Sequence, residues 1–200
     1  MTLVFGLTWD YRCPFARIAA DHVLTALEGG ADWDVTWVPF SLTQAHIEEG
    51  ELDAWDDPGK ADTLYAMEAG IVVRDRFAAQ FPAVHRGLFD ARHDQHRDLR
   101  TREVVHDVLA ANGVDPGAVD HEIDAGWPRV EFRKIHTDMV ESKAVFGVPT
   151  FLVGESAVFV RLMEGPGGDA ALARRTVERI VDTVTGWPEL NEFKHTSLAR

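Results

Sequence analysis

The first forty residues carry the pattern that most restricts how this chain can fold. Residues 3–8 form a short apolar run that predicts a buried strand. From Phe15 to about Leu27 apolar side chains recur at helical spacing, and two glycines at 29–30 end this predicted helix. Residues 33–40 alternate and are rich in β-branched and aromatic side chains, which predicts a second strand. A strand, a helix and a strand in this order predict a parallel pair joined by a right-handed crossover.

The next part of the chain, from 41 to 127, is predicted to be helical throughout. Ser41 with Gln44 resembles a capping box. Asp57-Pro58 and Asp115-Pro116 each place a capping carboxylate before a proline that suits the first helical turn. The segment contains no strand pattern, linker or repeat, so we expect a compact helical insertion domain. Its helices are expected at about 58–80, 83–94, 98–112 and 116–126.

The last part of the chain returns to alternating helix and strand. A long helix is expected over 129–146, a hairpin follows over 148–160, and Asp169 caps a final amphipathic helix. Without the helical segment the order is β-α-β-α-β-β-α, which is the thioredoxin arrangement. The predicted fold class is therefore α/β, a thioredoxin fold with an inserted all-helical domain. Its domains are a discontinuous thioredoxin-like domain, 1–40 and 128–200, and the insertion, 41–127.

Charge and hydropathy exclude several classes of partner. The chain has 33 acidic residues against 20 lysines and arginines, a formal charge of −13, which repels phosphate backbones and anionic lipid. No apolar run approaches the roughly 20 residues that span a bilayer. The first residues, Met1 to Gly6, show no basic segment and no signal-cleavage pattern. We therefore expect a cytoplasmic protein that binds neither nucleic acid nor membrane.

Cys13 is the single cysteine of the chain. An intramolecular disulfide and a multi-cysteine metal site are both impossible, so any redox chemistry needs a second thiol from outside. A lone cysteine is more often a small, inert core residue. The histidines 93, 96 and 106 are close in sequence, but polar helix surfaces explain them better than metal ligation, and no metal site is predicted.

Two short motifs favour a functional Cys13. Cys13-Pro14-Phe15-Ala16 lies at the junction of strand and helix, and Gly147-Val148-Pro149-Thr150 begins the third strand. With the helical insertion, these motifs resemble the DsbA-like thioredoxin-fold family, which contains DsbA and FrnE-like oxidoreductases. Kappa-class glutathione transferases and hydroxychromene-carboxylate isomerases are built in the same way. Family members carry Cys-Pro-x-Cys after the first strand and a Val-Pro-Thr with a cis-proline.

The resemblance implies a role for each motif residue. Cys13 would be the catalytic thiol, and Arg12, Pro14, Phe15 and Ala16 would complete the active-site motif. A cis bond before Pro149 would expose the backbone N–H and C=O of Val148, so Val148, Pro149 and Thr150 would bind substrate or thiol. The segment Glu189–Lys194 further resembles actinobacterial, mycothiol-linked members of the family.

The chain departs from the family at Ala16, which stands where the second cysteine is expected. Without that thiol the protein cannot resolve its own mixed disulfides. A helix N-terminus and the neighbouring Arg12 and Arg17 favour a thiolate, so we expect the pKa of Cys13 to lie below that of free cysteine. We expect the shift to be smaller than in dithiol relatives, because the partner thiol is absent.

Three functions remain open from the sequence. The first is a thiol-disulfide oxidoreductase that forms a mixed disulfide with an external low-molecular-weight thiol. The second is a glutathione- or mycothiol-dependent transferase or isomerase of the kappa-class type. The third is a non-catalytic protein that binds a peptide or ligand. We expect no tightly bound cofactor; mycothiol or glutathione would be a co-substrate, the partner a small-molecule thiol or disulfide, and a homodimer is left open.

Overall fold

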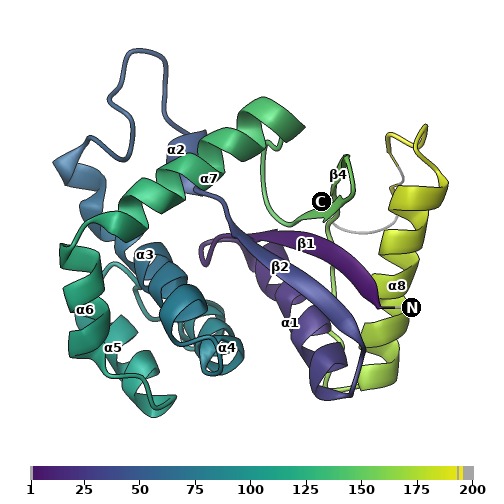
Figure 1. Cartoon of the computed structure of the whole chain (residues 1–200), viewed down its shortest axis with the longest axis horizontal. Coiled ribbons are helices and arrows are strands. Elements are labelled where there is room, and N and C mark those ends of the chain that lie inside the picture. The colour runs from purple at the N-terminus through teal and green to yellow at the C-terminus, as the bar shows by residue number, and fades with distance from the viewer. Residues whose placement is uncertain (1, 193, 196–200) are drawn as a thin grey trace.

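A computed structural model of the chain describes residues 2–192, 194 and 195, so Phe193 of the 189–194 segment lies outside the described residues. The expected order of elements is confirmed (Figure 1). The strands are β1 (Leu3–Trp9), β2 (Trp33–Pro39), β3 (Thr150–Val153) and β4 (Ser156–Phe159). The helices are α1 (Pro14–Glu28), α2 (Leu42–Ala45), the 3₁₀ turn η1 (Pro58–Lys60), α3 (Ala61–Arg76), α4 (Phe81–His93), α5 (Arg102–Ala111), α6 (Pro116–Asp124), α7 (Trp127–Lys143) and α8 (Ala170–Gly186).

The four strands form one sheet in the order β2-β1-β3-β4. β1 pairs with β2 in parallel, as the opening pattern predicts, and with β3 in antiparallel. β3 and β4 form the expected hairpin, with Thr150 opposite Phe159. This order brings four segments to one edge of the sheet: the segments after β1, β2 and β4, and the segment before β3.

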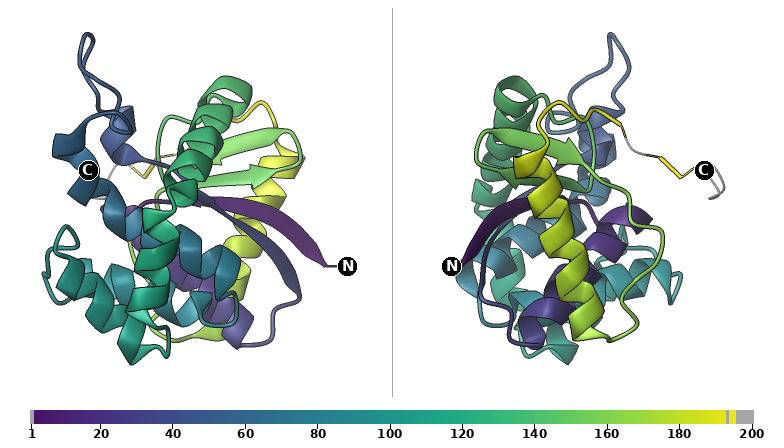
Figure 2. Two further views of the ribbon diagram at one scale, coloured as in Figure 1. Left: turned by 60° about the vertical axis from the view of Figure 1, so that its left-hand side comes forward. Right: turned by 90° about the vertical axis from the view of Figure 1, so that its right-hand side faces the viewer.

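Helices cover both faces of the sheet. α1 and α8 pack on one face and α7 crosses the other (Figure 1). On the first face a core of fully buried side chains fills the space between strands and helices, which explains the apolar faces of α1 and α8. The helices α3–α6 gather beyond the C-terminal ends of β1 and β2 (Figure 2, left), so the helical segment lies next to the edge where the four segments meet.

Some boundaries differ from the sequence-based expectation. The fifth helix begins at Arg102 instead of Asp98, because the Asp98 carboxylate binds the backbone N–H and guanidinium of Arg100 in a separate turn. α7 ends at Lys143, where Ala144 adopts a left-handed conformation with φ 52°. At Ser41 only half of the capping box forms. Its hydroxyl accepts the N–H of Gln44, but the Gln44 side chain binds Asp53 and the backbone of Ala54.

A second core joins the C-terminal end of β1 to the helical segment. Trp9 and Tyr11 are fully buried against α3 and α4. They approach α3 at Gly70 so closely that a Cβ there would lie 2.6 Å from Tyr11 Oη and 2.7 Å from Trp9 Cη2. Glycine at this position therefore permits the two aromatic rings to pack between the sheet and α3.

We predict that Gly70→Ala destabilises the fold. The added methyl group must displace two buried rings, which costs about 1–3 kcal/mol, and the better helix propensity of alanine offsets about 1 kcal/mol of that. Urea unfolding followed by circular dichroism measures the change. Gly186→Ala, at the last residue of α8 with open space around its Cβ, is the matched control and should leave stability unchanged or raise it. Equal stability of both variants would contradict the packing argument.

Candidate active site

Cys13 is the N-cap of α1, and its sulfur lies between two backbone groups from distant parts of the chain. The Sγ accepts the N–H of Ala16 at 3.4 Å and donates to the carbonyl of Val148 at 3.3 Å. The Val148–Pro149 peptide bond is cis. The side chain of Cys13 is almost buried, with 8% of the residue exposed. The structure thus brings together the two motifs that the sequence singled out, 135 residues apart.

The segment around Pro149 is fixed to the first strand. The N–H of Thr150 donates to the hydroxyl of Thr8 at 2.7 Å, and the hydroxyl of Thr150 donates to the carbonyl of Gly147 at 2.8 Å. Val148, Pro149 and Thr150 are all buried. Thr150 therefore holds the backbone that faces the thiol, while the Val148 carbonyl makes the contact itself.

A buried carboxylate organises the segment between β1 and Cys13. Asp10 is 1% exposed, and its two oxygens accept the backbone N–H groups of Arg12 and Leu42, both at 2.8 Å. Its own carbonyl accepts the N–H of Cys13 at 3.0 Å. Burial raises the pKa of Asp10, against the lowering effect of the two backbone hydrogen bonds. The sequence analysis missed Asp10, since nothing local indicates that this acid is buried.

Two histidines of α4 hold the neighbouring Tyr11. The Nδ1 of His85 lies 3.0 Å from the Tyr11 hydroxyl, and the Nε2 of His93 donates to the Tyr11 carbonyl at 2.9 Å. Burial lowers the pKa of His85 to about 3, so the ring is neutral, and its Nε2 has no hydrogen-bond partner among the described residues. Two hydrogen bonds from α4 thus fix the loop that precedes Cys13 to the helical segment. The spacing of eight residues, which places both histidines on one helix face, could have indicated this pair.

The expectation of a lowered pKa for Cys13 is wrong. Burial raises the pKa of the thiol above its ordinary value of 9.0, and this exceeds the lowering effect of the N–H groups of Ala16 and Phe15. The charge of Asp10 raises the pKa further, and that of Arg161 lowers it. The sequence shows the helix N-terminus but not the depth at which the sulfur lies.

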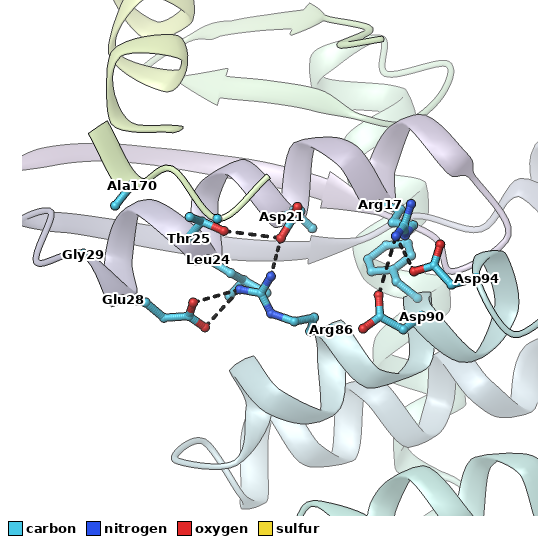
Figure 3. A pocket seen from close by; sticks show the side chains of 13 residues that line it. Arg17, Asp21, Leu24, Thr25, Glu28, Gly29, Arg86, Asp90, Asp94 and Ala170 are labelled. Atoms are coloured by element: carbon cyan, nitrogen blue, oxygen red, sulfur yellow. Dashed lines mark hydrogen bonds and ion pairs between the residues drawn. The ribbon is translucent and has the colours of Figure 1, made fainter. Parts of the chain in front are cut away.

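Arg17 does not support the thiol either. Its guanidinium pairs with Asp94, the residue that follows α4, and, at 3.8 Å, with Asp90 of α4. It belongs to a cavity of about 590 Å³ between α1 and α4 (Figure 3). In the same cavity Arg86 pairs with Asp21 and Glu28 of α1. Because these charges pair with one another, we interpret the cavity as a contact between α1 and α4 and not as a ligand site.

The other residues of the first motif differ in how far they are exposed. Arg12 and Pro14 are exposed, Phe15 is half-buried and Ala16 is buried. The Arg12 guanidinium donates to the hydroxyl of Thr43. The guanidinium of Arg161 lies over the ring of Phe15, 5.0 Å from its centroid. Sequence reasoning did not find Arg161, because only the pairing of the hairpin brings it to the site.

The described residues contain no group of three or more histidine, cysteine or carboxylate side chains placed to hold a metal ion. His93 and His106 bind different partners, since His106 contacts Tyr65 and Asp120 within the helical segment. Within the same described part of the chain, no helix is long and apolar enough to cross a membrane.

A family model, the DSBA-like thioredoxin domain, matches residues 8–165 of the chain. The match extends from the end of β1 past β4 and includes Cys13, the helical segment and Val148-Pro149-Thr150. A comparison with curated proteins gives no significant match.

Solved structures of this fold resemble the chain over most of its length. BdbD from Bacillus subtilis has a TM-score of 0.60 at 15% identity and covers 90% of this chain and 87% of its own. A 2-hydroxychromene-2-carboxylate isomerase has a TM-score of 0.60 at 16% identity, covering 94% of this chain and 100% of its own. MdbA, a thiol-disulfide oxidoreductase from Actinomyces oris, has a TM-score of 0.57 at 18% identity, covering 96% and 83%. At these identities the likeness establishes the fold.

We predict that alkylation of Cys13 by iodoacetamide has a higher pH midpoint in the folded protein than in the urea-unfolded protein. Iodoacetamide reacts with the thiolate, and a raised pKa means that the folded state holds the proton to higher pH. Rates measured from pH 6 to 11 give both midpoints, and the folded one should lie above 9.0. A folded midpoint below the unfolded one would restore the expectation of a primed thiolate.

We predict two effects of Asp10→Asn. Asparagine has one acceptor oxygen for the two N–H donors that Asp10 binds, so unfolding should become easier by about 1–2 kcal/mol. The pKa of Cys13 should fall, because a like charge near the sulfur is removed. Urea unfolding and the alkylation profile measure the two effects. Asp34→Asn, which makes the same charge change at an exposed position of β2, should alter neither quantity.

Proposed function

The chain belongs to the family of DSBA-like thioredoxin domains, and on that premise we propose that it is a thiol-disulfide oxidoreductase that works with the single thiol of Cys13. The observation that carries the proposal is the position of that sulfur. It lies at the N-terminus of α1 and 3.3 Å from the Val148 carbonyl beside a cis-proline. Two short motifs from distant parts of the chain therefore meet at this sulfur, which supports a functional thiol over an inert core cysteine.

The proposed reaction is thiol-disulfide exchange in two steps. The Cys13 thiol loses its proton to solvent, and the thiolate attacks one sulfur of a small disulfide. The Cys13–substrate disulfide forms, the substrate's own S–S bond breaks, and its other half leaves as a thiolate. An external low-molecular-weight thiol then attacks the substrate sulfur, forms a new small disulfide and releases the Cys13 thiolate. Electrons balance, because the external thiol is oxidised as the original disulfide is reduced.

The external thiol is required because the sequence contains no second thiol. Ala16 replaces the resolving cysteine, and the sequence has no other cysteine. In this proposal the backbone of Val148 and the segment of Pro149 and Thr150 bind the substrate next to the sulfur, and glutathione or mycothiol serves as co-substrate. Location in the cytoplasm stays a prediction of the sequence, and a homodimer stays open.

A transferase or isomerase of the kappa-class type is the second candidate. Two observations favour it: the raised pKa of Cys13, which disfavours a nucleophilic thiolate, and the likeness to the isomerase over its whole length. In this reading Cys13 donates a hydrogen bond to a bound thiol cofactor, and the cofactor's sulfur does the chemistry. A serine could then replace Cys13.

We predict that the purified protein forms a mixed disulfide at Cys13 when incubated with oxidised glutathione. The mass should increase by one glutathione moiety, and reduced thiol should reverse the change. Intact-protein mass spectrometry measures both. Cys13→Ser is the matched control, since it keeps an N-cap hydroxyl but has no sulfur, and it should show no adduct.

The competing functions give other results. Reduction of a small disulfide substrate that persists in Cys13→Ser would reject Cys13 as the nucleophile and favour a mechanism in which the sulfur of a bound thiol cofactor reacts. No adduct in the folded wild-type protein, with an adduct formed in urea, would mean that the sulfur is closed to substrates. The transferase or isomerase of the kappa-class type and a purely binding role would then remain.

A further inference from the structure

Two exposed arginines flank Cys13 along the sheet edge. The strand order β2-β1-β3-β4 sets their places. Arg12 follows β1 and reaches toward β2, where its guanidinium binds Thr43 of α2. Arg161 follows β4, and it is held near the site because the N–H of Val160 donates to the carbonyl of Pro149 at 3.1 Å. Cys13 and the Val148 carbonyl lie between these two positions in the order of the sheet.

Neither arginine makes an ion pair with a described residue, although the chain is strongly acidic. Most of the described arginines lie within 4 Å of a carboxylate, as Arg17 and Arg86 do. Arg12 binds only a hydroxyl, and Arg161 lies over the aromatic ring of Phe15. Asp10 lies beneath Arg12, but it is buried and its oxygens accept backbone N–H groups. The guanidinium groups of Arg12 and Arg161 are therefore open to an anion from solvent.

A chain with a formal charge of −13 repels small anions unless cations are placed locally. Two guanidinium groups that make no ion pair with a described residue place positive charge at this end of the sheet, beside the buried charge of Asp10, and their planar donors suit carboxylates. We propose that Arg12 and Arg161 bind carboxylates of the substrate, so that the site takes an acidic low-molecular-weight thiol or disulfide. This rests on the proposed function and deepens it.

Two such arginines would favour one of the two co-substrates, glutathione and mycothiol, that the sequence left open. Glutathione carries a carboxylate at each end of the molecule with its thiol between them, which suits one arginine on each side of Cys13. Mycothiol is a thiol on a sugar scaffold and has no carboxylate, so the two arginines would give it no charge-assisted hydrogen bond. An acidic peptide thiol therefore fits the site better than a neutral sugar thiol.

The test compares alkylation of Cys13 by iodoacetate, an anion, and by iodoacetamide, its neutral analogue. Both reagents consume the thiolate, so the ratio of their rates does not depend on the pKa of Cys13. Dividing by the same ratio for a neutral model thiol removes the intrinsic difference between the reagents. We expect a normalised ratio above one at low ionic strength. Without the arginines the net charge of the protein would bring it below one.

Four variants assign the effect to particular charges. Arg12→Gln and Arg161→Gln should each lower the ratio about two- to fivefold at low salt, and raising the ionic strength to about 1 M should remove most of the difference. Arg161→Lys keeps the charge and should keep most of the preference. Arg175→Gln makes the same charge change on α8, near the end that meets Gly29 at the far end of α1, and should leave the ratio unchanged.

Disulfide exchange gives a second readout. Adduct formation by mass spectrometry should be faster with oxidised glutathione than with its tetraethyl ester, in which all four carboxylates of the same skeleton are esterified. Equal rates for the two, or a normalised ratio that neither glutamine variant changes, would overturn the assignment to Arg12 and Arg161 and leave the oxidoreductase intact. Absence of reaction with every reagent in the folded protein would instead overturn the proposed function, and the inference with it.

Discussion

The buried carboxylate of Asp10 is the interaction on which the site depends. It follows β1 directly, and its oxygens hold the N–H of Arg12 in its own loop and the N–H of Leu42 at the start of α2. Burying a carboxylate is costly, and the two backbone donors offset the cost. The loop between β1 and α1 is thereby fixed to the segment after β2, which sets where Cys13 begins its helix.

The same constraint limits the acidity of the thiol. The buried position of Cys13 places its sulfur against the Val148 carbonyl. The same burial is the main reason why the pKa of the thiol is raised, and the charge of Asp10 raises the pKa further. A thiol of high pKa is a poor leaving group in exchange, so a mixed disulfide on Cys13 should persist. A family member without a resolving cysteine would then hold its substrate covalently until an external thiol arrives. Positively charged neighbours that attract an acidic thiol suit such a mechanism.

The sequence was informative wherever a signal was local. The βαβ unit, the helix start at Asp115-Pro116 and the hydroxyl of Ser41 as a cap are all encoded within a few residues, and all are observed, while Asp57-Pro58 opens a 3₁₀ turn just before α3. The two motifs around the sulfur could be found because each is short and contiguous. The direction of Arg17, the place of Arg161 and the burial of Asp10 depend on contacts between distant elements, so no window of sequence contains them. The expectation of a lowered pKa for Cys13 was wrong for this reason. The helix N-terminus can be recognised from neighbouring residues, but the burial that raises the pKa cannot.

The loss of the second cysteine at position 16 leaves the geometry of the site in place because that geometry is made by the backbone. The N–H of Ala16 and the carbonyl of Val148 contact the sulfur, and neither group depends on the side chain at position 16. The methyl group of Ala16 is 1% exposed and packs in the core shared with Cys13 and Trp9. The fold and the backbone contacts to the sulfur therefore do not require a second cysteine at this position. What then decides the chemistry is the charge around the sulfur and the thiol that the surroundings supply.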